Sequence, residues 1–217
     1  NKPGFVKIGS VGQLLPETEV KIADDGEICV RAPQNIKEYY KNEDATNELL
    51  KPGSNGSFWL HTGDVGHIDE DGYLFITDRK KDLIITAGGK NVAPQNIENL
   101  LKTSPYVSQA MVFGDKKPYL TALITMDEDE IAKFARDHKL LYQDLANLSK
   151  KEEVHELYRQ EVHIKNEKLA SYETIKKFFI LEEDFDQDKD ELTPTLKVRR
   201  KVVTERYRDI LENLYKA

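Results

Sequence analysis

The 217-residue sequence lacks several features that would place it in a class at once. Its single cysteine, Cys29, excludes an internal disulfide framework and a cysteine-rich metal site, and it suits a reducing compartment. No apolar run approaches the ~20 residues that a membrane-spanning helix needs. With 32 Lys and Arg against 39 Asp and Glu, the chain has no basic excess, which argues against nucleic acid as a partner. We therefore expect a soluble, cytoplasmic protein.

Common catalytic motifs are missing as well. The pair Gly89-Lys90 is followed by Asn91, so there is no phosphate-binding loop of the GxxxxGK[ST] type. The sequence also contains no GxGxxG, HExxH or GxSxG motif. The five histidines form no metal-binding pattern, so no metal site is expected, and Cys29 is interpreted as a small buried hydrophobe.

The first eighty residues are rich in strand and hairpin signals. Asp-Gly turns at residues 25–26 and 71–72 each lie between short apolar segments, a pattern typical of β-hairpins. A short helix is expected between the hairpins, over residues 42–50. Closely spaced hairpins predict a small distorted β-barrel or hairpin subdomain, which we assign to residues 1–79.

After residue 80, helices and strands alternate. A capping box of Ser149 and Glu152 is expected to open one of the longer helices. The other expected elements are helices over 94–102, around 131–135 and over 203–214, and strands over 107–113, 119–126 and 178–181. The pattern predicts an α+β domain over residues 80–217, with a small sheet flanked by helices.

Two segments near the expected domain boundary carry polar groups suited to nucleotide chemistry. In WLHTGD, residues 59–64, the carboxylate of Asp64 could accept hydrogen bonds from two vicinal ribose hydroxyls. In DRKKD, residues 78–82, Arg79 could bind sugar or phosphate oxygens, and a lysine in a linker could absorb a backbone rotation without burying an unpaired charge. Each segment also has a simpler interpretation, as a turn and as a solvated charge run respectively.

Two further segments lie in the second domain. Gly88 and Gly89 precede the helix that begins at Pro94, and paired glycines let a backbone approach a ligand closely. Lys197 lies in the segment TPTLKVRR, residues 193–200, where it could meet a developing negative charge. The alternatives are a flexible turn and a basic helix start near the preceding acids.

The order and spacing of these segments are more specific than any one of them. WLHTGD, then DGYLFITDRKKDLIITAGGKNVAPQNIE, then TPTLKVRR resembles the carboxyl-terminal part of the AMP-forming acyl-CoA synthetases. These enzymes belong to the adenylate-forming superfamily, with the luciferases and the peptide-synthetase adenylation domains. DRKKDLI at the linker, and Leu196 where most of the superfamily has glycine, are similar to the long-chain fatty acid–CoA ligases.

The resemblance implies a role for each candidate residue. Asp64 would hold the ribose hydroxyls of ATP and of the acyl-adenylate, and Arg79 would contact the same ribose or the phosphate. Lys197 would act as the catalytic lysine, reaching ATP and the fatty carboxylate during adenylation. Lys81 would be the hinge residue. Gly88 and Gly89 would lie in a CoA-binding loop, brought towards the pantetheine channel when the small mobile domain turns.

The implied reaction has two halves. A fatty carboxylate attacks the α-phosphate of ATP with Mg²⁺, pyrophosphate leaves, and the CoA thiol then displaces AMP to give the thioester. The family's phosphate-binding segment and its Tyr-Gly-x-Thr-Glu motif would both precede this sequence. We therefore expect a fragment that is inactive alone. Its partners would be fatty acid, ATP, CoA and the missing N-terminal domain, which would bind most of the ATP and Mg²⁺.

Three alternatives stay open at this point. Another carboxylic acid could be the substrate, or a carrier-protein thiol the acceptor, because the acyl pocket would belong mainly to the missing part. A non-catalytic binding module is a different class of function. Loose association of the parent protein with the inner membrane face is a further hypothesis, since long-chain substrates partition into bilayers, although no lipidation signal or basic amphipathic helix is evident.

Overall fold

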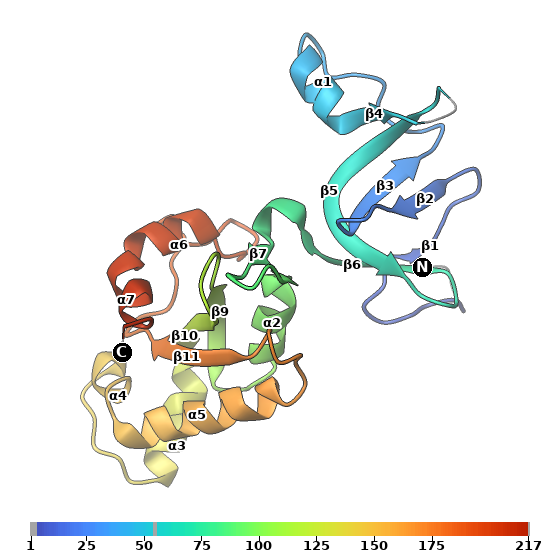
Figure 1. Ribbon diagram of the computed structural model, residues 1–217. Helices are drawn as coiled ribbons and strands as arrows, with labels where there is room; N and C mark the ends of the chain where they lie inside the picture. The colour runs from blue at the N-terminus through green and yellow to red at the C-terminus, as the bar shows by residue number, and fades with distance from the viewer. Residues whose placement is uncertain (1–3, 54–55, 217) are drawn as a thin grey trace. The chain divides into compact units, whose positions relative to one another are not determined.

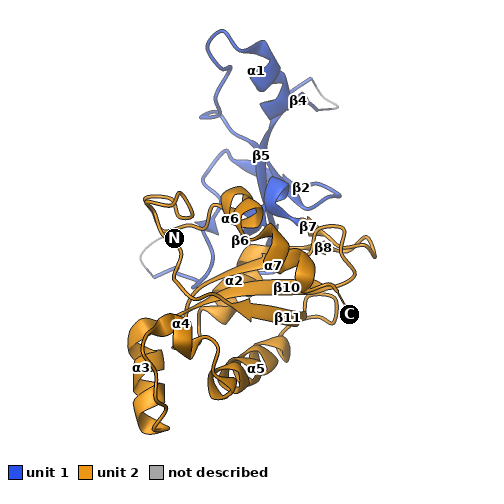
Figure 2. Ribbon diagram, turned by 90° about the vertical axis from the view of Figure 1, so that its left-hand side faces the viewer, with its two compact units in different colours: residues 1–83 blue, residues 84–217 orange. Residues whose placement is uncertain are grey.

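The computed structural model describes residues 4–53 and 56–216. The chain divides into two compact units, residues 1–83 and residues 84–217 (Figure 2). The boundary expected after residue 79 lies shortly before this division. Within the described residues, no helix combines the length and the apolar character that crossing a bilayer requires.

Unit 1 contains one antiparallel sheet and a short helix (Figure 1). Its strands pair in the order β1-β6-β5-β3-β2, and β4 also pairs with β5. The elements are β1 (Gly12–Gln13), β2 (Glu19–Ile22), β3 (Glu27–Arg31), α1 (Glu43–Leu49), β4 (Leu50–Pro52), β5 (Phe58–Ile68), β6 (Tyr73–Arg79) and the short 3₁₀ helix η1 (Lys80–Asp82). Both predicted hairpins are confirmed, as β2–β3 and β5–β6.

The barrel expectation is wrong, because the sheet of unit 1 is open. Strand β5 curves through the centre of the sheet and pairs with β3, β4 and β6 (Figure 1). A barrel would need its two outer strands to pair with each other. In the described part of the chain β1 pairs with β6 and β2 with β3, and no pairing joins β1 to β2.

Unit 2 is a mixed α/β structure around a three-stranded sheet of order β11-β10-β9. Strand β10 is antiparallel to β9 and parallel to β11. The strands are β7 (Ile84–Ile85), β8 (Asn91–Val92), β9 (Val107–Phe113), β10 (Leu120–Met126) and β11 (Ile175–Ile180). The helices are α2 (Pro94–Leu101), α3 (Glu128–Asp137), α4 (Leu145–Leu148), α5 (Glu152–Asn166), α6 (Arg200–Arg206) and α7 (Arg208–Asn213).

The core of unit 2 lies on both faces of this sheet. Strand β10 is buried along its whole length, so its alternating side chains divide between two apolar clusters. Ala122 and Ile124 pack in the larger cluster, which includes residues of α2, α3 and α5. Leu123 packs with Met111, Val203 and Leu211 in the smaller cluster, which α6 and α7 complete. The expected flanking of a small sheet by helices is confirmed.

Two local predictions in unit 2 are wrong. Ser149 does not cap α5: its hydroxyl donates to the Ala146 carbonyl oxygen, 2.9 Å away, because Ser149 closes the preceding helix α4. The N-cap residue of α5 is Lys151, which makes no capping hydrogen bond. The final helix is also interrupted, since Tyr207 leaves the helical conformation and separates α6 from α7.

Candidate functional site

Asp64 and Arg79 form an ion pair in unit 1. They are partners across β5 and β6, and Arg79 Nε lies 2.7 Å from Asp64 Oδ1. The Asp64 side chain is 23% exposed and that of Arg79 is 59% exposed, so the pair faces solvent. The structure thus joins two of the residues that the sequence singles out.

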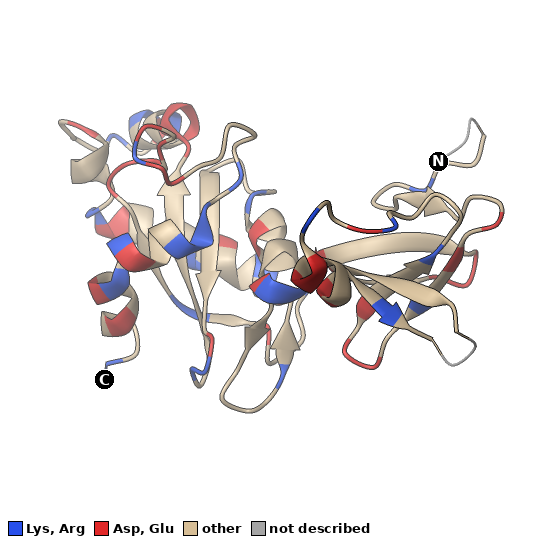
Figure 3. Cartoon of the chain, turned by 90° about the horizontal axis from the view of Figure 1, so that it is seen from above, with Lys and Arg blue, Asp and Glu red and all other residues tan. Residues whose placement is uncertain are grey.

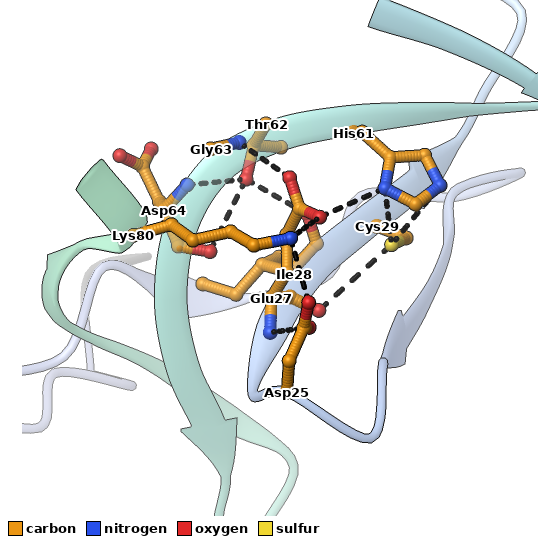
Figure 4. A network of polar contacts seen from close by, with 9 residues as sticks. All are labelled: Asp25, Glu27, Ile28, Cys29, His61, Thr62, Gly63, Asp64 and Lys80. Atoms are coloured by element: carbon orange, nitrogen blue, oxygen red, sulfur yellow. Dashed lines mark hydrogen bonds and ion pairs between the residues drawn. The ribbon is translucent and has the colours of Figure 1, made fainter. Parts of the chain in front are cut away.

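The bend of β5 determines where the Asp64 carboxylate points. Gly63 has a φ of 70°, a left-handed conformation that glycine adopts without strain. Thr62 Oγ1 donates to the Ile28 carbonyl oxygen (2.7 Å) and accepts from the Asp64 amide (3.0 Å). These bonds fix the Asp64 backbone against β3, and the Asp64 carboxylate points away from the cluster beside it (Figure 4).

The cluster beside Asp64 centres on the buried carboxylate of Glu27 (Figure 4). Glu27 Oε1 accepts from the Gly63 amide at 3.0 Å. Glu27 Oε2 lies 2.9 Å from both His61 Nδ1 and Lys80 Nζ, and the Lys80 ammonium reaches Asp25 Oδ2 at 2.6 Å. A buried acid therefore connects β3, the bend in β5 and the residue that opens η1.

The charges of this cluster stabilise one another. The Asp25 and Glu27 carboxylates raise the pKa of Lys80 to about 12. The hydrogen bond from Lys80 lowers the pKa of Asp25. Burial raises the pKa of Glu27, but hydrogen bonds from His61 and Lys80 outweigh it, and the net shift is downward. The sequence analysis did not single out Glu27 or Lys80. An acidic residue at the start of an apolar strand, as Glu27 is, was the signal that could have indicated a buried acid.

The structure also brings His61 and Cys29 close to Glu27, a grouping that sequence reasoning missed. Their ligand atoms lie within 4.8 Å of one another, with Cys29 Sγ 3.6 Å from His61 Nδ1. Both Glu27 oxygens already accept hydrogen bonds, and the Lys80 ammonium beside Oε2 would repel a metal cation. Burial, reinforced by Glu27, raises the pKa of the Cys29 thiol. These contacts favour a hydrogen-bonded cluster of side chains over a metal centre.

The glycine pair lies in the turn between β7 and β8 in unit 2. Ile84 and Ile85 pair with Val92 and Asn91, and within the turn the Gly89 amide donates to the Thr86 carbonyl oxygen at 2.8 Å. Gly89 has a φ of 73°, so a side chain there would strain the backbone. Open space surrounds it within 4 Å. The turn is therefore hydrogen-bonded and accessible.

Lys197 lies at the end of a tight turn in unit 2. A bridge between Leu192 and Val198 closes this turn. The Thr193 amide donates to the Lys197 carbonyl oxygen (2.8 Å), and the Lys197 amide donates to Thr193 Oγ1 (3.1 Å). Leu196 has a φ of 58°, the left-handed conformation that glycine would adopt more easily. Leu196 thus adopts a backbone conformation that usually requires glycine.

The basic neighbours of Lys197 are engaged elsewhere. Arg199 pairs with Asp190, and Arg200 pairs with Glu98 (2.6 Å) and donates to the Val112 carbonyl oxygen (2.7 Å). Figure 3 shows acidic and basic residues interspersed along this unit. Within the described residues, none forms an ion pair with the exposed Lys197. Lys197 is therefore available to an external anion.

A buried acid supports the turn that carries Lys197. Glu191 is 0% exposed, and its Oε1 accepts from Arg206 Nη1 (2.9 Å) and from the Tyr207 hydroxyl (3.0 Å). Its Oε2 accepts from the Asp186 amide (3.0 Å), and its backbone carbonyl accepts from the Arg199 amide (2.7 Å). Burial, with the nearby Glu191 charge, raises the pKa of Tyr207 to about 12. Sequence reasoning also missed this residue.

The candidate residues thus form two groups. Asp64, Arg79 and Lys81 belong to unit 1, and the Gly88–Gly89 turn and Lys197 belong to unit 2. Residues 81–217 match the model of the AMP-binding enzyme C-terminal domain, and the chain belongs to this family.

The chain is also similar to individual proteins of known name or known structure. The chain is 43% identical over 211 residues to the long-chain-fatty-acid–CoA ligase FadD15 of Mycobacterium tuberculosis, covering 97% of this chain and 34% of that protein. It is 34% identical over 238 residues to the human long-chain-fatty-acid–CoA ligase ACSBG1, covering 99% and 32%. The O-succinylbenzoate CoA synthetase MenE of Bacillus subtilis, solved in complex with AMP, superposes with a TM-score of 0.60 at 28% identity, covering 93% and 37%. The chain spans about a third of the length of these curated relatives.

Proposed function

We propose that this chain is the C-terminal part of an acyl-CoA synthetase that activates a long-chain fatty acid with ATP and transfers it to CoA. One observation carries the proposal: the 43% identity to a named long-chain-fatty-acid–CoA ligase extends over 97% of the chain. Residues 1–79 would be the end of the large adenylate-forming domain, and residues 80–217 the small mobile domain. The parent would release AMP and pyrophosphate in two half-reactions.

Asp64 and Arg79 are proposed to bind the nucleotide. Their ion pair engages Oδ1 of Asp64, and within the described chain Oδ2 stays available to a ribose hydroxyl. The Arg79 guanidinium carries several donors in a planar fork, so it can hold Asp64 and still bind a ribose or phosphate oxygen. The pair would then order the ribose beside the bend in β5.

Lys197 is proposed to act in the adenylation step. As the fatty carboxylate oxygen attacks the α-phosphate, negative charge develops on the phosphate oxygens while pyrophosphate leaves. An exposed ammonium group on a hydrogen-bonded turn can stabilise that charge with little reorganisation. Mg²⁺ would be held mainly by the part of the protein outside this chain, where it would neutralise charge on the phosphates.

The second half-reaction would follow a turn of the small domain about Lys81. Lys81 is exposed, lies in η1 and is close to the division between the units. The turn would withdraw Lys197 and present Gly88 and Gly89 to the pantetheine chain of CoA. The CoA sulfur would attack the acyl carbonyl carbon, and the bond to AMP would break.

The remainder of the parent is proposed to cover unit 1. Large apolar side chains lie exposed on this unit, which is unusual for a free domain. They include Phe5 (61%), Ile8 (96%), Leu15 (63%) and Phe58 (58%).

We propose a cytoplasmic parent protein, with loose attachment at the inner membrane face as a hypothesis that follows from the substrate.

The deciding experiment is fatty-acid-dependent ATP–pyrophosphate exchange by the full-length protein. We expect exchange with long-chain acids and a fall of about 10²–10³-fold in Lys197→Ala, the loss typical of one transition-state donor. Lys201→Ala is the matched control, because Lys201 is an exposed lysine nearby that has no proposed role. The isolated chain should form no acyl-CoA.

Other outcomes would point elsewhere. Exchange that Lys197→Ala leaves unchanged would mean that this lysine does not act in adenylation. Exchange with other carboxylic acids but not long-chain acids, or acyl transfer to a carrier-protein thiol, would keep the superfamily and change the substrate or acceptor. Absence of exchange with every acid would favour a binding module.

A further inference from the structure

Adjacent lysines at the end of unit 1 have different surroundings. Lys80 Nζ lies 2.6 Å from Asp25 Oδ2 and 2.9 Å from Glu27 Oε2. Lys81 is exposed, and within residues 4–53 and 56–216 no carboxylate forms an ion pair with it. The ammonium group of the first lysine is thus paired with carboxylates of the unit 1 sheet, and the ammonium group of the second is not.

The two carboxylates that pair with Lys80 are themselves held in place within unit 1. The Glu27 side chain is 6% exposed, against 40% for Lys80, and Glu27 is also held by the Gly63 amide and by His61. Asp25 is fixed in the β2–β3 turn because its Oδ1 accepts from the Glu27 amide at 3.1 Å. The Lys80 ammonium group is therefore held by two carboxylates of the β2–β3 hairpin, and β5 in turn holds one of these carboxylates.

We propose that Lys80 is a positioning residue that fixes the start of the linker on unit 1, so that rotation is confined to Lys81 and the residues after it. The inference rests on the proposed function and adds a residue to it. Without these ion pairs the flexible segment would begin earlier, near Arg79. The loosened segment would then include the residue proposed to bind the nucleotide, and the turn towards the thioester-forming orientation would be less well defined.

Asp25→Asn in the full-length protein tests this inference. The amide keeps an oxygen for the Glu27 backbone and removes the charge that faces Lys80. Asp24→Asn removes a charge from the same turn as a matched control. Lys80→Met removes the ammonium group, and Lys80→Arg should restore the behaviour of the unchanged protein.

The first measurement is the rate of trypsin cleavage after Lys81. We expect about threefold faster cleavage in Asp25→Asn and Lys80→Met, the size of effect that a partly exposed ion pair supports. The second measurement is the ratio of thioester formation to pyrophosphate exchange, which should fall by a similar factor in both variants. Asp24→Asn and Lys80→Arg should change neither quantity.

Each result decides the inference. Unchanged cleavage in Asp25→Asn and Lys80→Met would overturn the attachment of the linker start. Faster cleavage with an unchanged ratio of the two half-reactions would overturn the positioning role. If no acid supports exchange, the proposed function fails, and the cleavage comparison still decides whether Lys80 holds the linker.

Discussion

Replacing Glu191 should loosen the turn that carries Lys197. The Glu191 carboxylate is fully buried and accepts hydrogen bonds from Arg206, the Tyr207 hydroxyl and the Asp186 amide. Glu191→Ala removes the two carboxylate oxygens that accept these three bonds, and it leaves the partly buried Tyr207 hydroxyl and Asp186 amide without these partners. Because Lys197 is on the same turn, adenylation should slow although Glu191 contacts no substrate.

The size of the effect follows from these contacts. A hydrogen bond contributes about 1 kcal/mol net, and more when one partner is charged. The bond to Arg206 is discounted because the Arg206 side chain is 41% exposed. Three bonds therefore amount to about 3 kcal/mol of local stability, which is roughly a hundredfold in an opening equilibrium. Glu191→Gln keeps the volume and one oxygen, so it should lose about half of this free energy.

Hydrogen exchange measures this opening directly. In Glu191→Ala the amides of Thr193, Lys197 and Arg199 should exchange on the order of 100-fold faster. Glu183→Ala is the control, since the Glu183 side chain is 70% exposed and pairs with the surface residue Lys189. Unchanged exchange at the three amides in Glu191→Ala would refute the reasoning.

Three further predictions concern backbone strain, close packing and pH. Leu196→Gly should stabilise the folded state by about 1 kcal/mol, because glycine adopts the left-handed conformation without strain. Glycine also gives the unfolded chain more conformational entropy, which destabilises the folded state by a similar amount. The free energy of unfolding from urea titration should therefore change by less than about 1 kcal/mol. A gain or loss well beyond that would contradict the account. Gly66→Ala should prevent normal β5–β6 pairing, because a Cβ atom there would lie 2.0 Å from the Phe75 carbonyl oxygen. Gly72→Ala, with open space and a φ of 77°, should cost about 1 kcal/mol in the same titration, and equal costs would refute the packing argument. The lowered pKa values of Asp25 and Glu27 stabilise the fold above about pH 4.5, and this stability is lost as pH falls through the folded-state values. The raised pKa of Lys80 stabilises it below about pH 10.5, with loss towards pH 12. Melting temperatures should therefore fall at both extremes, and Asp25→Asn should weaken both falls.

Local signals predicted much of the fold. The Asp-Gly turns at residues 25–26 and 71–72 lie in the observed hairpins, because such turns favour the twist of paired strands. Pro94 begins α2 as expected. The alternating residues of β10 divide between the two faces of the sheet, as a period of two requires.

The missed features depend on contacts between distant residues. Whether a sheet closes depends on the pairing of its edge strands, which hairpin signals do not encode. Ser149 and Glu152 match a capping box, yet the hydroxyl bonds back to Ala146 because another helix ends there. Lys80 resembles any lysine in a charged run until Glu27, far earlier in the sequence, supplies its buried partner. The roles of Asp64, Arg79, Lys81, Gly88, Gly89 and Lys197 stay predictions.

The parallel pairing of β10 with β11 has a consequence for folding order. The connection between these strands contains α3, α4 and α5, so the pairing closes a long loop, whereas β9 and β10 are near neighbours in sequence. Loop closure costs entropy before the contacts are gained, and non-local pairing slows folding. We expect the β9–β10 hairpin to form early on the ribosome. Strand β11 would dock much later, when it has itself left the exit tunnel after α5, and until then the Leu120–Met126 backbone would present an unpaired edge to chaperones.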